Sequence, residues 1–336
     1  MATFDLLQHD LQSTIDPQVR SEILHALWNW NGIADAQNFA QDSACFDSFF
    51  EYYDQQCAAA LHDTKYQTLD INKTKLSIKS SLRLSLLLND SNDSDELLED
   101  GLDLAARVWL MLFVGEYRQI IGPAQRQIVW NENDSLRGLL EREFSNHAEA
   151  SDNVKLERLF TARNMERIAG LEIIWTSNLA DHLRLFDDDT RVAIFHQACF
   201  LKHMQSQDIF PEGFIEETLR TLALIFPEGD KDCWRWFEIK KSKNNLDPEA
   251  RKCGNPSSEE RQIHKFRYWH DRLIILKQAF DEKEPATIYQ WWHDRRRRVQ
   301  WYTFWVAVVV IGLTIFFGFV QCVEGALQVY KAWYPS

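Results

Sequence analysis

Three histidines and one cysteine are the side chains whose spacing comes nearest to a chemical site. His196, Cys199 and His203 fall at i, i+3 and i+7, so a helix would carry them on one face. Imidazole nitrogen and thiolate sulfur bind zinc, and His182 would bring the set to four ligands. The alternative is structural, with histidines that bond to the backbone and Cys199 as a small apolar residue. We favour the alternative, because closed zinc sites have tighter spacing, and we expect no cofactor.

A repeated string, Trp-His-Asp-Arg, is a second chemical candidate. It contains the adjacent pairs His270 with Asp271 and His293 with Asp294, each of which could act as a general base. Neighbours on a helix point about 100° apart, so neither side chain is expected to orient the other. The motifs GxSxG, HExxH, GxxxxGK[ST] and GxGxxG are absent from the sequence. We therefore expect no catalytic residue of the common classes.

A long uncharged run near the C-terminus gives the strongest structural signal. From Val299 to Val323 there are 25 residues without a charge, and about 20 helical residues cross a hydrocarbon core about 30 Å thick. Amphipathic rings that favour the headgroup layer flank both ends, namely Trp301, Tyr302, Trp305, Trp333 and Tyr334. The sequence predicts one membrane-spanning helix at 299–323 and a short tail at 324–336, with the lipid bilayer as its partner.

The charges around this run predict its orientation. Four arginines precede it, Arg295, Arg296, Arg297 and Arg298, whereas Lys331 alone follows it. Arginine is costly to move across a bilayer, so the preceding domain is expected in the cytosol. The N-terminus has no basic start with an apolar run of signal length. The chain is therefore typical of a tail-anchored, single-pass membrane protein.

Small residues recur every four positions inside the predicted span. Thr314, Gly318, Cys322 and Ala326 form a narrow stripe on which another helix could pack closely. Small residues are also common in spanning helices without such a role. Self-association through this stripe is one expectation, and a protein partner for the cytosolic domain is another.

Composition limits the partners further. The formal net charge is −13, and −17 without the four arginines, so attraction to nucleic acid phosphates is not expected. Six cysteines are widely spaced without a CxxC pair, which favours reduced thiols. Both features are typical of an acidic cytosolic domain.

Polar tracts and helical periodicity predict the organisation of the chain. We expect an N-terminal helical region at 1–90 with short strands near Leu76–Leu86, an acidic loop at 91–103 and an α-rich domain at 104–239. A linker at 240–260 should then separate amphipathic juxtamembrane helices at 261–298 from that domain. The fold class is mainly α with a small β-hairpin, that is α+β.

Local signals place individual elements. Helical patterns cover Val19–Trp30, Ser43–Leu61 and Leu97–Val114. Asp134 or Ser135 can cap one short helix, and Thr161 can cap another. Alternation across an acidic turn predicts a hairpin at 183–195. Its size resembles the wing of a winged-helix unit, although the basic recognition helix of DNA-binding modules is missing.

Three segments together resemble a known family. Trp175–Leu201, Phe266–Ala307 and Phe316–Ala332 are similar to an uncharacterised family of filamentous-fungal proteins with a helical cytosolic domain and a single C-terminal transmembrane helix. The resemblance implies architecture and transfers no catalytic residue. We expect a membrane-anchored, non-catalytic protein whose domain binds another protein. The alternative is a membrane-tethered enzyme or metal-binding protein that acts through His196, Cys199 and His203.

The orientation can be tested with acceptor sites that the sequence already contains. Asn72, Asn89, Asn92 and Asn133 each begin an N-x-[ST] sequence, and such sites are glycosylated only on the lumenal side. We predict that endoglycosidase leaves the electrophoretic mobility unchanged. Changing the four arginines to glutamine and adding lysines after Trp333 should weaken or invert the orientation. N-glycans on the unaltered protein would contradict the cytosolic placement.

Overall fold

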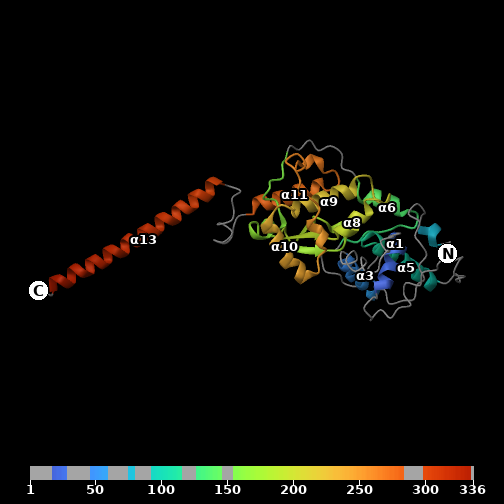
Figure 1. Cartoon of the computed structure of the whole chain (residues 1–336), viewed down its shortest axis with the longest axis horizontal. Helices are drawn as coiled ribbons and strands as arrows, with labels where there is room; N and C mark the ends of the chain where they lie inside the picture. The colour runs from blue at the N-terminus through green and yellow to red at the C-terminus, as the bar shows by residue number, and fades with distance from the viewer. Residues whose placement is uncertain are drawn as a thin grey trace.

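The structure is a computed structural model that describes residues 17–28, 46–59, 75–79, 92–115, 126–145, 154–283 and 298–333. It confirms a mainly helical fold with a small sheet and a long C-terminal helix (Figure 1). The helices are α1 (Pro17–Trp28), α3 (Asp47–Ala59), α5 (Asn92–Leu110), α6 (Leu136–Glu143), α7 (Ala162–Arg167), α8 (Ala198–Met204), α9 (Phe214–Ile225), α10 (Lys231–Asn244), α11 (His270–Glu282) and α13 (Arg298–Trp333). The strands are β1 (Glu172–Thr176), β2 (Leu185–Phe186) and β3 (Arg191–Phe195), and the 3-10 turns are η2 (Leu179–Asp181), η3 (Pro248–Arg251) and η4 (Ile263–Lys265).

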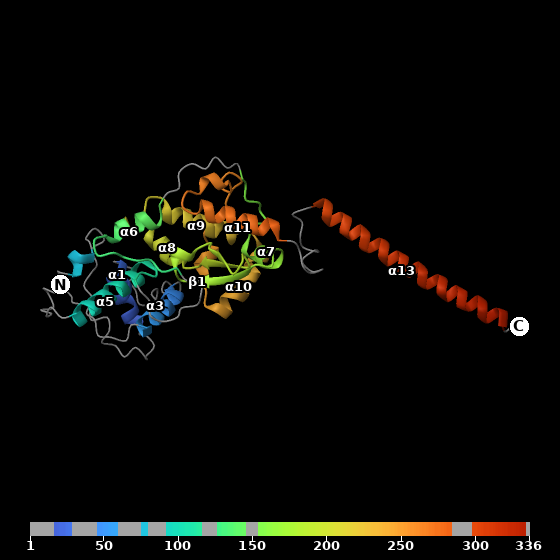
Figure 2. The same cartoon turned by 180° about the vertical axis from the view of Figure 1, so that it is seen from behind.

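Helices α1, α3 and α5 gather at one end of the globular body (Figures 1 and 2). Both α1 and α3 lie where helical periodicity predicts them. The Trp28 ring of α1 packs against Phe49 of α3, with 4.6 Å between centroids, and against Phe200 of α8 at 5.5 Å. Aromatic packing thus joins the N-terminal helices to the centre of the chain.

The predicted acidic loop at 91–103 is wrong, because α5 begins at Asn92. Leu98, Leu102 and Ala106 recur every four residues and are buried, so they form one apolar face of a helix. Of the described acidic residues, Glu99 is half-buried and Asp100 is exposed, whereas Asp103 is buried and pairs with Lys75 at 2.8 Å. Of the short strands expected near Leu76–Leu86, the first part is wrong, since residues 75–79 are helical, and the rest lies outside the described residues.

The predicted hairpin is confirmed and forms part of a three-stranded sheet in the order β1-β3-β2. β2 pairs with β3 antiparallel, with Leu185 opposite Val192, and β1 pairs with β3 parallel. The turn between β2 and β3 has positive φ at Asp187, Asp188 and Asp189, between 52° and 59°, a conformation that aspartate tolerates better than most residues. The winged-helix resemblance of this hairpin stays a prediction.

Helices cover the sheet on two sides. Both views place α9 and α11 on one side and α10 on the other (Figures 1 and 2). Trp175 of β1 packs on the α10 side against Trp236 and Phe237, with centroid distances of 6.1 and 6.4 Å. On the opposite side, Arg272 of α11 donates hydrogen bonds to the carbonyl oxygens of Ala180 and His182. The sheet is therefore the middle layer of the body.

The segment predicted as a linker, 240–260, belongs to this body. Its first residues continue α10 as far as Asn244, and Leu246, Asp247 and Ala250 are buried. Polar composition is misleading here, because Lys240, Asn245 and Asp247 bond to other parts of the body while a few apolar side chains enter the core. Ser257 and Glu260 form both hydrogen bonds of a capping box, but α11 begins only at His270.

Helix α11 is attached to the body rather than set apart as a juxtamembrane element. The large apolar side chains that recur here every three or four residues, Phe266, Trp269, Leu273, Leu276 and Phe280, are all buried. The carboxylate of Glu217 on α9 accepts the backbone N–H groups of residues 267, 268 and 269 at 2.7, 2.8 and 2.9 Å. The body thus extends to α11, and residues 284–297 of the predicted juxtamembrane helices lie outside the described residues.

Limited proteolysis of the native chain should spare residues 240–260, although trypsin has several lysines and arginines to cut there. Cleavage requires local unfolding, which would expose Leu246 and Ala250. Fragment masses after a short trypsin digestion measure this. Ala250→Asp, which buries an unpaired charge costing several kcal/mol, should accelerate cleavage there more than about tenfold. A first cut inside 240–260 of the unaltered protein would contradict this prediction.

Candidate functional site

The residues considered for metal binding are spread over three separate environments. His196 lies directly after β3, and its Nδ1 accepts the backbone N–H of Asp247 at 3.3 Å. The ring meets Trp175 edge-on, with 6.2 Å between centroids. Burial lowers the pKa of His196 to about 4, so the imidazole is neutral at neutral pH. This histidine acts as an interior hydrogen-bonding group.

Cys199 is disulfide-bonded, which contradicts the expectation that all six cysteines are reduced. Cys233, Cys253 and Cys322 are free cysteines. Widely spaced cysteines gave no signal of the bond, because sequence spacing does not reveal which residues the fold brings together. A disulfide sulfur is not a thiolate ligand, so Cys199 in this state does not bind zinc.

The other two histidines are engaged elsewhere. His203 places Nε2 at 3.1 Å from the carbonyl oxygen of Trp28. His182 is buried, accepts the Phe195 N–H at Nδ1 and meets the Thr221 hydroxyl at Nε2, at 3.2 and 2.7 Å. Burial, aided by the cation of Arg272, lowers the pKa of His182 to about 3. Within the described part of the chain, no group of three His, Cys, Asp or Glu side chains could hold a metal ion.

A buried carboxylate that the sequence analysis missed lies at the centre of the His196 environment. Asp247 accepts the Cys199 N–H at Oδ2 and the Glu249 N–H at Oδ1, at 2.6 and 2.8 Å. Burial raises the pKa of Asp247 to about 7, against the opposing effect of these two donors. An Asp followed by Pro248 is a helix-start signal, and the residue does cap η3. The sequence thus contains the helix-start signal at Asp247, but nothing in the sequence indicates that this carboxylate is buried.

The pair of His270 and Asp271 differs from its expected geometry. His270 Nδ1 lies 3.0 Å from Asp271 Oδ1, although adjacent helical residues were expected to point apart. Trp269, the residue before His270, is outside helical geometry, so the first turn of α11 allows the contact. His270 is buried and Asp271 is exposed. The second pair, His293 and Asp294, lies outside the described residues.

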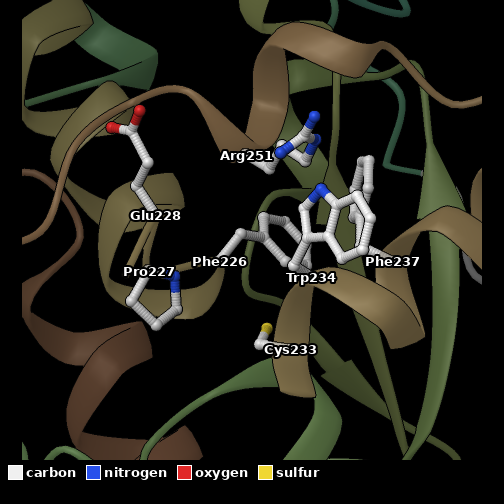
Figure 3. A pocket seen from close by; sticks show the side chains of 7 residues that line it. All are labelled: Phe226, Pro227, Glu228, Cys233, Trp234, Phe237 and Arg251. Carbon is white, nitrogen blue, oxygen red and sulfur yellow. The ribbon is translucent and has the colours of Figure 1, made fainter. Parts of the chain in front are cut away.

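A small pocket opens at the start of α10 (Figure 3). Its walls come from Phe226, Pro227, Glu228, Cys233, Trp234, Phe237 and Arg251. The free volume is about 10 Å³, at the lower limit for one water molecule and far below that of a substrate pocket. Burial, with Asp230 nearby, raises the pKa of the Cys233 thiol to about 12, so it is not an activated nucleophile.

Helix α13 carries the residues predicted at the membrane boundary. Of its 36 residues, Trp301–Tyr330 is long and apolar enough to cross a membrane, and none of its most apolar window is buried. Trp301, Tyr302 and Trp305 occupy its first turns, and Trp333, 81% exposed, ends it. Arg298 begins the helix, while Arg295, Arg296, Arg297 and Tyr334 lie outside the described residues. Thr314, Gly318, Cys322 and Ala326 are exposed along it.

Comparison with known proteins adds no assignment. No protein-family model matches the chain, and neither a curated protein nor a solved structure matches it. The resemblance to a fungal family therefore stays a prediction.

The neutral state of His196 can be tested through the pH dependence of stability. The pKa of His196 in the folded chain is about 4, below the ordinary value of 6.5. Between these two pH values the imidazole is therefore protonated in the unfolded chain but neutral in the folded chain. In His196→Asn the amide oxygen can still accept the Asp247 N–H. Relative to this variant, the wild type should lose about 1.4 kcal/mol of unfolding free energy per pH unit between pH 6 and 4.5.

Denaturant unfolding of the full chain in mild detergent, followed by tryptophan fluorescence, measures this difference. His25→Asn, at an exposed position of α1, is the matched control and should reproduce the wild-type profile. Parallel pH profiles for wild type and His196→Asn would show that His196 does not titrate as described.

Proposed function

We propose that this chain is a single-pass membrane protein whose acidic helical body is held at the bilayer to bind another protein. The observation that supports this proposal most is helix α13. Its segment Trp301–Tyr330 is predominantly apolar over 30 residues, and its most apolar part is not buried against the body. An exposed apolar surface of this length is unfavourable in water and is what a spanning helix presents to lipid tails. Membrane anchoring accounts for it without another partner.

For sidedness, two observations oppose each other. The four arginines before α13 favour a cytosolic body, whereas the disulfide at Cys199 favours an oxidising compartment. We give more weight to the arginines, because their charge is permanent while a disulfide follows the redox state of its surroundings. On this proposal the Cys199 bond is reduced in the resting cytosol, and thiol alkylation during lysis measures that state directly.

A binding role for the body is supported by how its polar groups are used. The histidine, cysteine and buried carboxylate around α8 all bond to the backbone or to each other, so this cluster supports the fold. The enzyme alternative receives no support from these residues. A body of this kind, fixed at a membrane, is suited to concentrating a protein partner at that surface.

Anchoring is tested by extraction of membranes with alkaline carbonate. The full chain should remain in the membrane pellet, and a chain that ends before Arg298 should become soluble. Changing Val309 and Val310 to arginine should release most of the protein, since each central arginine costs about 3 kcal/mol on insertion. A full chain found in the soluble fraction would overturn the proposal. Proximity labelling by the full and truncated chains then identifies partners that depend on anchoring.

A further inference from the structure

The exposed surface of α13 has two unlike faces. At about 100° per residue, one line through Thr314 gathers every position within about 40° of it along the span. These positions are Thr303, Ala307, Val310, Thr314, Gly318, Gln321, Gly325 and Gln328. All except Val310 are small or uncharged polar residues, and all are exposed on the helix. We call this set the polar stripe.

The opposite face is bulky and apolar. Within about 40° of the opposite line lie Trp301, Trp305, Val309, Gly312, Phe316, Phe319, Val323, Leu327 and Tyr330. Gly312 is the single small residue among them. The aromatic rings at both ends of this face suit the two headgroup layers, and the residues between them suit lipid tails. The polar stripe is therefore the face of α13 that is least suited to contact with lipid tails.

Gln321 is the critical residue of the stripe because of its depth. Trp301–Tyr330 spans 30 residues, or about 45 Å, which matches a bilayer of about 40–45 Å with its headgroup layers. The central 20 residues, 306–325, then lie in hydrocarbon. Gln321 sits about four residues, or about 6 Å, inside the far border, and Glu324 lies next to that border, where its carboxylate can extend to the headgroup layer. A carboxamide at this depth loses its water and requires hydrogen-bond partners.

Helix α13 itself does not supply those partners. The Thr314 hydroxyl donates to the Val310 carbonyl oxygen at 2.8 Å, so this polar group is satisfied within the helix. The structure shows no hydrogen bond from the Gln321 side chain to any described residue, and its amide has two donor hydrogens and one acceptor oxygen. Its partner must come from outside the helix.

We propose that α13 pairs along the polar stripe with α13 of a second copy of this chain, with the two Gln321 carboxamides hydrogen-bonded to each other. The proposal rests on the membrane insertion proposed above. All copies insert in one orientation, so Gln321 of each lies at the same depth. A carboxamide both donates and accepts, so it complements itself. Gly318 and Gly325, about one turn to either side, allow the two backbones to approach closely.

This face differs from the four-residue recurrence seen in the sequence. Steps of four residues turn about 40° each, so Cys322 and Ala326 lie about 80° and 120° away from Thr314. Alternating steps of three and four residues keep the polar stripe on one side, as in left-handed helix pairs. The two faces share Thr314 and Gly318 and separate after them.

The glycines provide a matched pair of variants. A Cβ added at Gly312 or at Gly318 meets no atom within 4 Å, so leucine at either position has the same consequences for a single helix. Gly318 lies on the polar stripe and Gly312 on the lipid-facing side. Different effects of these two changes must therefore come from a second molecule.

The experiment measures energy transfer between full-length chains labelled with donor or acceptor dyes on a short C-terminal tag. The chains are reconstituted together in phosphatidylcholine vesicles and diluted with lipid. Wild type should show transfer above that of randomly distributed molecules. Gln321→Leu and Gly318→Leu should each weaken association about tenfold, which corresponds to about 1.4 kcal/mol. Gly312→Leu should change it less than twofold, and Gln321→Asn should keep most of it.

Three results would overturn the pairing: transfer at the random level in wild type, unchanged association in Gln321→Leu, or equal losses in Gly312→Leu and Gly318→Leu. Carbonate extraction of each labelled protein is measured alongside. Loss of the wild type from the vesicles would refute membrane anchoring itself, whereas anchored but unpaired chains would refute the pairing alone.

Discussion

The carboxylate of Glu217 joins the last helix of the body to its centre. Its side chain is 2% exposed, and burial raises its pKa while three backbone N–H groups oppose that rise. Those N–H groups belong to residues 267–269, immediately before α11, and buried backbone donors outside helices and sheets need such side-chain acceptors. Next to Glu217, the Thr218 hydroxyl accepts the indole N–H of Trp269 at 2.9 Å. Glu217 therefore fixes the start of α11, while the hydrogen bonds of Arg272 and the buried apolar side chains hold the rest of the helix.

The same arrangement recurs at two other irregular segments. Asp181 accepts the backbone N–H of Arg126 and a side-chain bond from Asn178 at 2.8 Å, and Asp247 holds the start of α8 to η3. The sheet is small, so much of the backbone runs outside ladders and needs side-chain acceptors. Perturbed carboxylates are typical of active sites, but here their hydrogen-bond partners are backbone N–H groups and, at Asp181, also the side chains of Asn178 and Arg184, and support of the fold explains them.

Elements whose signals are local could be predicted from the sequence. Ser135 and Thr161 cap α6 and α7 through their side-chain oxygens, and the alternation around Val192 gave the hairpin. The predictions for the acidic start of α5 and for the polar segment after Asn244 were wrong. In both segments the burial of a few apolar residues decides the structure, although most of the residues are polar. The disulfide at Cys199 and the acceptors Glu217 and Asp247 join residues far apart in sequence. No periodicity within a segment reveals such pairs.

The charge of the body bears on how two anchored copies could meet. Without Arg295 to Arg298 the chain carries a formal charge of −17, so two bodies above paired membrane helices repel each other. At physiological ionic strength the Debye length is about 8 Å, shorter than the diameter of such a body, and most of this repulsion is screened. Confinement to a bilayer raises the effective concentration of α13 without new contacts. Pairing through the polar stripe is therefore favoured in the membrane and weakened at low salt. Bodies free in solution would repel each other in the same way but would lack the raised effective concentration.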